Sequence, residues 1–210
     1  MADGTEVRAA IAAERHDLAA VLTGLSEQQW DTPTLCAGWR VREVVAHMTM
    51  PFRVSTPRVL LGMLKARGDF ARMADQSARA DAASLTSGEL ATCVEDNADH
   101  AWKPPGGGFE GALSHDVIHG LDFTVPLGIS RKVPDDRLRI VLDGVNAKNV
   151  KFFGTDLTGV ELRADDLDWS FGSGAPVFGA AQDLLLVLCG RLLPAGRLHG
   201  TPSARFTHTP

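Results

Sequence analysis

Histidines on two apolar helical stretches constrain the fold of this chain more than any other feature. His115 and His119 stand four residues apart on one predicted helix, so both side chains leave the same face, about 5–6 Å apart at their β-carbons. His47 lies in the apolar stretch 44–48 of a second predicted helix and is expected to point inward. A buried imidazole needs a hydrogen-bond partner or a cation. The fold must therefore supply one or the other to these three side chains.

Three neutral imidazoles and one water form the open tetrahedral arrangement of a catalytic zinc site. Nickel and iron accept the same ligands. Two histidines at this spacing also arise by chance. The alternative is therefore that each histidine is a core residue whose ring is hydrogen-bonded to a backbone carbonyl. We predict one divalent metal held by His47, His115 and His119. The other histidines lie in polar stretches or near the end of the chain and are expected at the surface: His16, His100, His199 and His208.

The N-terminal part of the sequence begins with a pattern of helices and short loops. Apolar residues recur at helical spacing over residues 5–25, and a capping box opening at Ser26 predicts a short helical turn through Trp30. Residues 31–39 are rich in turn formers and are expected to form a loop. A further helix starts near Val41.

Proline and glycine mark the ends of the next helices. Pro51 is expected to kink or end the helix that starts near Val41, and a helical continuation is predicted beyond residue 57. Helices are also predicted over 86–102 and 109–124, separated by a Pro-Pro-Gly-Gly-Gly loop at 104–108. Four principal helices joined by loops indicate a helix bundle.

The pattern changes after Pro134. A helix is predicted from residue 135, and then short segments with strand character, punctuated by glycine and aspartate, follow at 159–163, 167–171 and 176–178. A last helix over 180–189 is expected to end at Gly190. The tail 201–210 is expected to fray. The sequence thus predicts two domains, a helical bundle over 1–130 and a small α/β domain over 131–210.

Composition excludes several classes of protein. The formal net charge of the 210 residues is −5 and no long basic cluster occurs, which argues against a nucleic-acid surface. The longest apolar run falls short of the roughly 20 residues that a membrane span requires, and the acidic first residues do not resemble a signal peptide. Three widely spaced cysteines indicate a reducing compartment. We expect a cytoplasmic protein, a monomer or homodimer, with no nucleic-acid or membrane partner.

Two motifs resemble a known family. Residues 35–48, Leu-Cys-Ala-Gly-Trp-Arg-Val-Arg-Glu-Val-Val-Ala-His-Met, resemble the cysteine-glycine-tryptophan loop and histidine helix of the mycothiol-dependent maleylpyruvate isomerase family. That family belongs to the wider DinB/YfiT-like superfamily of metal-binding four-helix bundles. Residues 114–122, Ser-His-Asp-Val-Ile-His-Gly-Leu-Asp, resemble its second metal motif, and 167–170 with the helix reaching Arg191 resemble its small C-terminal domain.

The resemblance implies an α+β, mainly α protein, with an N-terminal DinB-like four-helix bundle and a small C-terminal α/β domain. It implies a divalent metal, usually zinc, on His47, His115 and His119, and a low-molecular-weight thiol such as mycothiol activated beside it. One position differs from the isomerases, which are expected to carry glutamate four residues before the second-helix histidine, where this chain has His115. A neutral imidazole in place of a carboxylate leaves the site more positive. Three histidines are more typical of the broader DinB-like group.

Other residues near these motifs are candidates for roles in the site, each with a plainer alternative. Asp122 is placed to orient the His119 imidazole, or lies solvated at the end of its helix. Arg191 is a candidate to bind a substrate carboxylate, although an arginine at a helix end also suits the helix dipole. Trp39 is a candidate to line the pocket and contact the cofactor, or is simply buried between loop and bundle. Cys36 is interpreted as a small buried thiol rather than a nucleophile or a fourth ligand.

These features predict a metal-dependent enzyme that uses a thiol for isomerase or S-transferase chemistry on a small electrophile. The alternatives are a metal-dependent hydrolase on the same bundle, a non-catalytic metal-binding stress or sensor protein, and a bundle without metal. An enzyme needs an exchangeable ligand position, whereas a structural site is closed by a fourth protein ligand.

Overall fold

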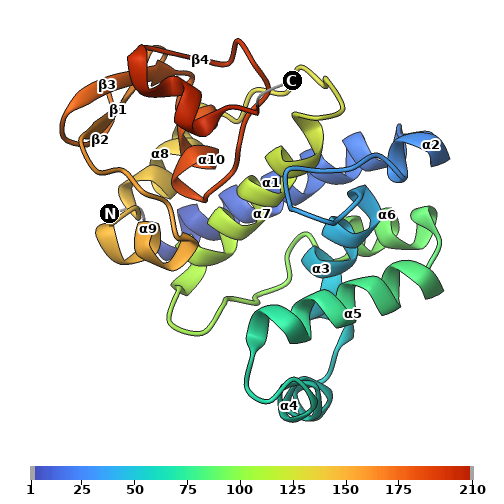
Figure 1. Cartoon of the computed structure of the whole chain (residues 1–210). Coiled ribbons are helices and arrows are strands. Elements are labelled where there is room, and N and C mark those ends of the chain that lie inside the picture. Colours follow the sequence, from blue (N-terminus) through green and yellow to red (C-terminus); the bar gives the residue numbers. More distant parts are fainter. Residues whose placement is uncertain (1–2, 209–210) are drawn as a thin grey trace. The chain divides into compact units, whose positions relative to one another are not determined.

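The computed structural model describes residues 3–208. Its chain divides into two compact units, Met1–Phe123 and Thr124–Pro210. The first is helical and the second combines helices with a small sheet (Figure 1). The predicted fold class, mainly α with a small α/β part, is confirmed. The domain boundary at residue 130 remains a proposal.

The first unit is built from seven helices within the described residues. Side chains of Asp3, Ser26, Asp69 and Thr86 accept hydrogen bonds from the first turns of four of them, which satisfies backbone donors that have no partner within the helix. Helix α3 packs against α5 and α6, and α1 packs against α6 (Figure 1). The helices are α1 (Gly4–Thr23), α2 (Glu27–Trp30), α3 (Val41–Arg53), α4 (Thr56–Lys65), α5 (Phe70–Ser84), α6 (Ser87–Asp96) and α7 (Gly108–Thr124).

Helices α1 and α7 approach closely at Gly120. A β-carbon at Gly120 would lie 2.6 Å from Cδ2 of Leu18, a side chain that is fully buried on α1. This contact requires a glycine one residue after His119. The close approach therefore fixes the helix that carries two of the three site histidines.

Three expectations for this unit need correction. The helix predicted over 86–102 ends at Asp96, because the carbonyl groups of Asn97, Ala98 and His100 accept hydrogen bonds from the buried Arg15 instead of continuing a helix. Helix α5 is not among the four that the pattern predicts, since its buried face consists of Met73 and three alanines. Pro51 lies inside α3, which continues to Arg53.

The second unit folds around one fully buried helix. Every residue of α10 (Ala181–Leu188) is buried, and α10 contacts α8 and the strands β1 and β3. The strand order is β2-β1-β3-β4, with β1 and β3 parallel and the two outer pairs antiparallel. The other elements are α8 (Asp135–Asp143), α9 (Ala147–Phe153), β1 (Val160–Ala164), β2 (Ser170–Gly172), β3 (Ala175–Gly179), β4 (Leu198–His199) and a 3₁₀ helix, η1 (Thr201–Phe206).

The link from β2 to β3 passes the start of β1 at Gly174. Its φ of +135° is a conformation that side-chain-bearing residues rarely adopt. A β-carbon there would lie 2.2 Å from the carbonyl oxygen of Gly159, so two backbones are in contact at this point. Glycine at position 174 is what allows β3 to pair with β1 in parallel.

The C-terminal tail, expected to fray, is folded over its described part. Residues Thr201–Phe206 form η1, and Phe206 is 6% exposed. Leu193 N–H donates to the carbonyl of Phe206, and His208 N–H donates to that of Leu193. The prediction failed because the tail is ordered by contacts with residues before it in the chain and not by a local pattern. Residues 209 and 210 lie outside the described part.

No helix of the described residues is long and apolar enough to cross a membrane. Cys36, Cys93 and Cys189 form no disulfide in this part of the chain.

Candidate metal centre

The three predicted histidines meet within the first unit. His47 comes from α3, and His115 and His119 come from successive turns of α7. One ring nitrogen of each lies within 4.8 Å of those of the other two. Arg40 caps the start of α3, and its backbone N–H donates to the Glu43 carboxylate, while the four-residue spacing on α7 aligns its two histidines.

The ring nitrogens are placed as a divalent cation requires. Nε2 of His115 and Nε2 of His47 are 3.3 Å apart, close to the roughly 3.4 Å between two nitrogens bound at about 2.0–2.1 Å in a tetrahedral site. Nδ1, the other nitrogen of the His47 ring, is buried and has no hydrogen-bond partner among the described residues, so no protein group there decides which nitrogen carries the proton. The donor set therefore fits a metal with histidine ligands, zinc first and nickel or iron next.

Burial keeps His47 in its neutral form. Burial is the largest cause, and together with the neighbouring His119 and His115 it lowers the pKa of His47 to about 2, while Asp122 acts in the opposite direction. Only a neutral imidazole has the lone pair that a metal binds. At neutral pH His47 is ready to act as a ligand without first losing a proton.

Two buried carboxylates orient the histidines of α7. Asp122 Oδ2 lies 3.0 Å from Nδ1 of His119, and the role of Asp122 in orienting that ring remains a proposal. Asp116 Oδ1 lies 3.0 Å from Nδ1 of His115, a contact that sequence reasoning missed. Each carboxylate favours the tautomer with the proton on Nδ1, so Nε2 presents its lone pair. The spacing of Asp122 from His119 was the signal for the first contact, and adjacency to His115 is a weaker signal for the second.

Arg15 holds Asp116 in place. Its Nε donates to Asp116 Oδ2 at 2.7 Å, and the two side chains are 1% and 2% exposed. The partners are 101 residues apart in the sequence, and Arg15 sits among polar residues at the sequence level. Nothing in the sequence pattern distinguishes it from a surface arginine.

Cys36 lies beside the histidines but is not part of their group. Its thiol donates to Asp122 Oδ2 at 3.0 Å, and its sulfur is 3.9 Å from Nδ1 of His119. A hydrogen bond to a carboxylate stabilises the S–H form, which is not the nucleophilic form. Among the described residues, no fourth histidine, cysteine or carboxylate joins the group of His47, His115 and His119. A tetrahedral metal held by these three histidines would therefore have one position left for an exogenous molecule.

Trp39 and Arg191, the remaining predicted residues, lie in different units. The ring centre of Trp39 is 5.2 Å from that of His47, so the indole borders this histidine, and its role in lining the pocket or contacting the cofactor remains a proposal. Arg191 follows α10 in the second unit, where its Nη1 donates to the carbonyl of Cys189. The role of Arg191 toward a substrate remains a proposal. The histidines expected at the surface are exposed: His16, His100, His199 and His208.

The first unit is thus a helical bundle in which two helices bring three histidines together at a candidate metal site. Residues 11–107 match the family model of the mycothiol maleylpyruvate isomerase N-terminal domain, a range that includes His47 and its preceding loop. The resemblance to this family that the first motif indicated is thereby confirmed over this range of the chain.

Comparison of whole chains extends the likeness beyond this domain. Two uncharacterized proteins of Mycobacterium tuberculosis, MT0041 of strain CDC 1551 / Oshkosh and Rv0036c of strain H37Rv, are each 28% identical over 91% of this chain and 87% of their own length. The crystal structure of the mycothiol-dependent maleylpyruvate isomerase has a TM-score of 0.63 and 13% identity, over 100% of this chain and 95% of that one. A histidine-to-alanine variant of that isomerase gives a TM-score of 0.60 at 12% identity and the same coverage. At these identities the two structures establish the fold.

Proposed function

We propose that this protein is a metal-dependent enzyme that activates a low-molecular-weight thiol, mycothiol, for addition to a small electrophile. Such an addition has two outcomes. In an isomerase the adduct rearranges and releases the thiol, and in an S-transferase the thiol stays in the product. The single observation that carries the proposal is the three-histidine group, which no fourth ligand from residues 3–208 joins, in a domain that matches the mycothiol maleylpyruvate isomerase family model.

The chemistry of a free thiol explains the need for a cation. A thiol with a pKa near 8.5 is mostly protonated at neutral pH, and its thiolate is the nucleophile. A bound divalent cation supplies the positive charge that favours the thiolate. His47, His115 and His119 would hold that cation. Because all three imidazoles would be uncharged, they would not offset the positive charge of the metal.

The surrounding residues keep the ligands in place during the reaction. Asp116 and Asp122 accept from Nδ1 of their histidines and hold both rings in one orientation. Trp39 covers one side of His47 and limits access of water there. For a substrate that carries a carboxylate, Arg191 is the residue we propose to bind it, because its guanidinium can form two parallel hydrogen bonds to a carboxylate. We place the reaction in the cytoplasm.

Metal analysis tests the first half of the proposal. Purified protein, reconstituted with zinc and desalted, is expected to hold about one zinc per chain by elemental mass spectrometry, as a three-histidine site would. The His115→Ala variant is expected to lose it. His100→Ala is the matched control, since His100 is exposed and lies outside the three-histidine group. No metal in the reconstituted wild-type protein would overturn the proposal.

Thiol binding and turnover test the second half. Mycothiol added to the Co²⁺-substituted protein is expected to produce a sulfur-to-cobalt charge-transfer band, which His115→Ala lacks. Turnover is then measured with maleylpyruvate and with a halogenated aromatic electrophile, so that isomerase and transferase outcomes are separated. Arg191→Ala should raise KM for the carboxylate-bearing maleylpyruvate and leave KM for the uncharged electrophile unchanged. A metal that binds no thiol would contradict the proposed enzyme and favour a non-catalytic metal protein.

A further inference from the structure

The loop that precedes α3 is fixed to α7 at one end. We call residues 34–39 the strap. The backbone N–H of Leu35 donates to the carbonyl of Asp122, and the thiol of Cys36 donates to the carboxylate of the same residue. The strap is therefore attached to the residue that orients His119.

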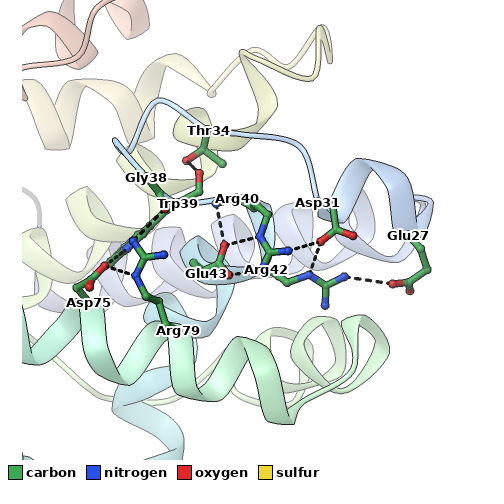
Figure 2. A network of polar contacts seen from close by, with 10 residues as sticks. All are labelled: Glu27, Asp31, Thr34, Gly38, Trp39, Arg40, Arg42, Glu43, Asp75 and Arg79. Atoms are coloured by element: carbon green, nitrogen blue, oxygen red, sulfur yellow. Dashed lines mark hydrogen bonds and ion pairs between the residues drawn. The ribbon is translucent and has the colours of Figure 1, made fainter.

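At its other end the strap is fixed to α5 through side chains. The indole Nε1 of Trp39 donates to Asp75 Oδ1 at 2.7 Å, and Arg79 Nε donates to the same oxygen at 2.9 Å (Figure 2). Arg79 Nη2 also donates to the carbonyl of Gly38 at 3.0 Å. Hydrogen bonds from Arg79 and then Trp39 hold the pKa of Asp75 below its usual value, so the acceptor remains charged.

The conformation of Gly38 makes this attachment possible. Its φ is +76°, and a β-carbon there would lie 3.4 Å from Nη2 of Arg79. A residue with a side chain at position 38 would be strained by this φ, while its β-carbon would just touch the guanidinium that holds the strap. The strap is thus shaped to accept a side chain from α5.

Between its two attachments the strap places Trp39 against the site. The indole and the His47 imidazole have ring centres 5.2 Å apart and planes inclined by 50°. Asp75 and Arg79 are 41% and 51% exposed, so their ion pair contributes little to stability. Their contacts instead fix the orientation of an aromatic ring at a metal ligand. Such a ring is a flat apolar surface for the organic part of a molecule bound beside it.

We propose that Asp75 and Arg79 are positioning residues for the cofactor, which hold the Trp39 indole beside His47 as the surface on which the bound thiol packs. This role rests on the proposed function, and neither residue contacts a histidine of the site. Loss of either side chain frees the indole to adopt other rotamers. The affinity for the thiol then falls while the affinity for the metal is unchanged.

The test compares Asp75→Ala and Arg79→Ala with Asp81→Ala. Asp81 lies on the same helix and forms an ion pair with Arg53 of α3, so it matches Asp75 in kind but does not touch the strap. Alanine favours the helix at all three positions. In two-dimensional NMR of the metal-free protein, the indole N–H signal of Trp39, identified by its loss in Trp39→Phe, should shift in the two test variants and remain in place in Asp81→Ala. The ring signals of His47 should shift with it.

Ligand affinity supplies the second readout. With Co²⁺-substituted protein, the dissociation constant for mycothiol should rise about fivefold or more in Asp75→Ala and Arg79→Ala, as expected for loss of charge-assisted contacts. The affinity for Co²⁺ and the melting temperature should match those of Asp81→Ala. Unchanged Trp39 and His47 signals, or an unchanged affinity for mycothiol, would overturn the inference. Failure of the wild-type protein itself to bind mycothiol would refute the proposed function, and the NMR signals would still decide whether Asp75 and Arg79 position Trp39.

Discussion

The buried ion pair between Arg15 and Asp116 connects the stability of the bundle to the proposed metal centre. The pair is 2.7 Å long and both side chains are almost fully buried. Removing one partner of such a pair leaves an uncompensated charge and costs about 3–5 kcal/mol. In Asp116→Ala the guanidinium keeps its hydrogen bonds to three backbone carbonyls. We therefore expect a loss near the lower end, about 3 kcal/mol of unfolding free energy.

The same substitution removes the acceptor of His115 Nδ1. The ring is then free to turn and to change tautomer, so zinc affinity is expected to fall about 10- to 100-fold. Asp116→Asn separates the two effects, because its amide oxygen still accepts from Nδ1 but carries no charge. It should retain most of the zinc affinity and still lose stability.

Urea unfolding of the metal-free proteins at pH 7, and zinc titration against a competing chelator, measure the two quantities. Glu95→Ala is the control, since Glu95 forms an exposed ion pair with His16, the neighbour of Arg15. It should stay within about 0.5 kcal/mol of the wild type. If the unfolding free energy of Asp116→Ala also stays within about 0.5 kcal/mol of the wild type, the reasoning is refuted, because the buried pair would then behave as a surface pair.

Two further predictions follow from the structure. The pKa of His47 is lowered from 6.5 to about 2 in the folded protein, so the unfolded chain binds more protons below pH 6.5 and stability falls as the pH is lowered. As the pH is lowered below 6.5, the unfolding free energy of the metal-free protein, measured with urea, should fall by about 1.4 kcal/mol more per pH unit than that of His47→Gln. Equal dependence of the two unfolding free energies on pH would contradict the lowered pKa of His47. Gly174→Ala should unfold the second unit, because its methyl group meets the Gly159 backbone. Circular dichroism that matches the wild type would show that the strands pass each other in another way.

Local pattern in the sequence was sufficient where a helix has a clear apolar face or a capping signal. The prediction over 109–124 agrees with α7 (Gly108–Thr124), the capping box predicted at Ser26 is present, and a capping box at Thr86 opens the helix predicted from residue 86. The strands were found to within a few residues, as β1 and β3 show. Helix α5 was missed because alanines fill most of its buried face and give no strong apolar period. The short strand β4 and the helix α9 were also not predicted.

The three-histidine group itself was accessible from sequence, because spacing on a helix decides which side chains share a face. His115 and His119 follow from that rule alone, and the apolar surroundings of His47 indicated the third. What surrounds the group was not accessible. Arg15 reaches Asp116 across 101 residues, and Asp75 reaches Trp39 across 36.

Sequence by itself determined the helices that have a clear apolar face or a capping signal, and which histidines share a helix face, since these depend on neighbours within about one helical turn. Tertiary structure alone decided which carboxylate orients which histidine, which arginine is buried, and how the strap is attached to both α5 and α7. Those contacts depend on how helices pack, and a hydrogen bond between distant residues leaves no periodic trace in the chain that forms it.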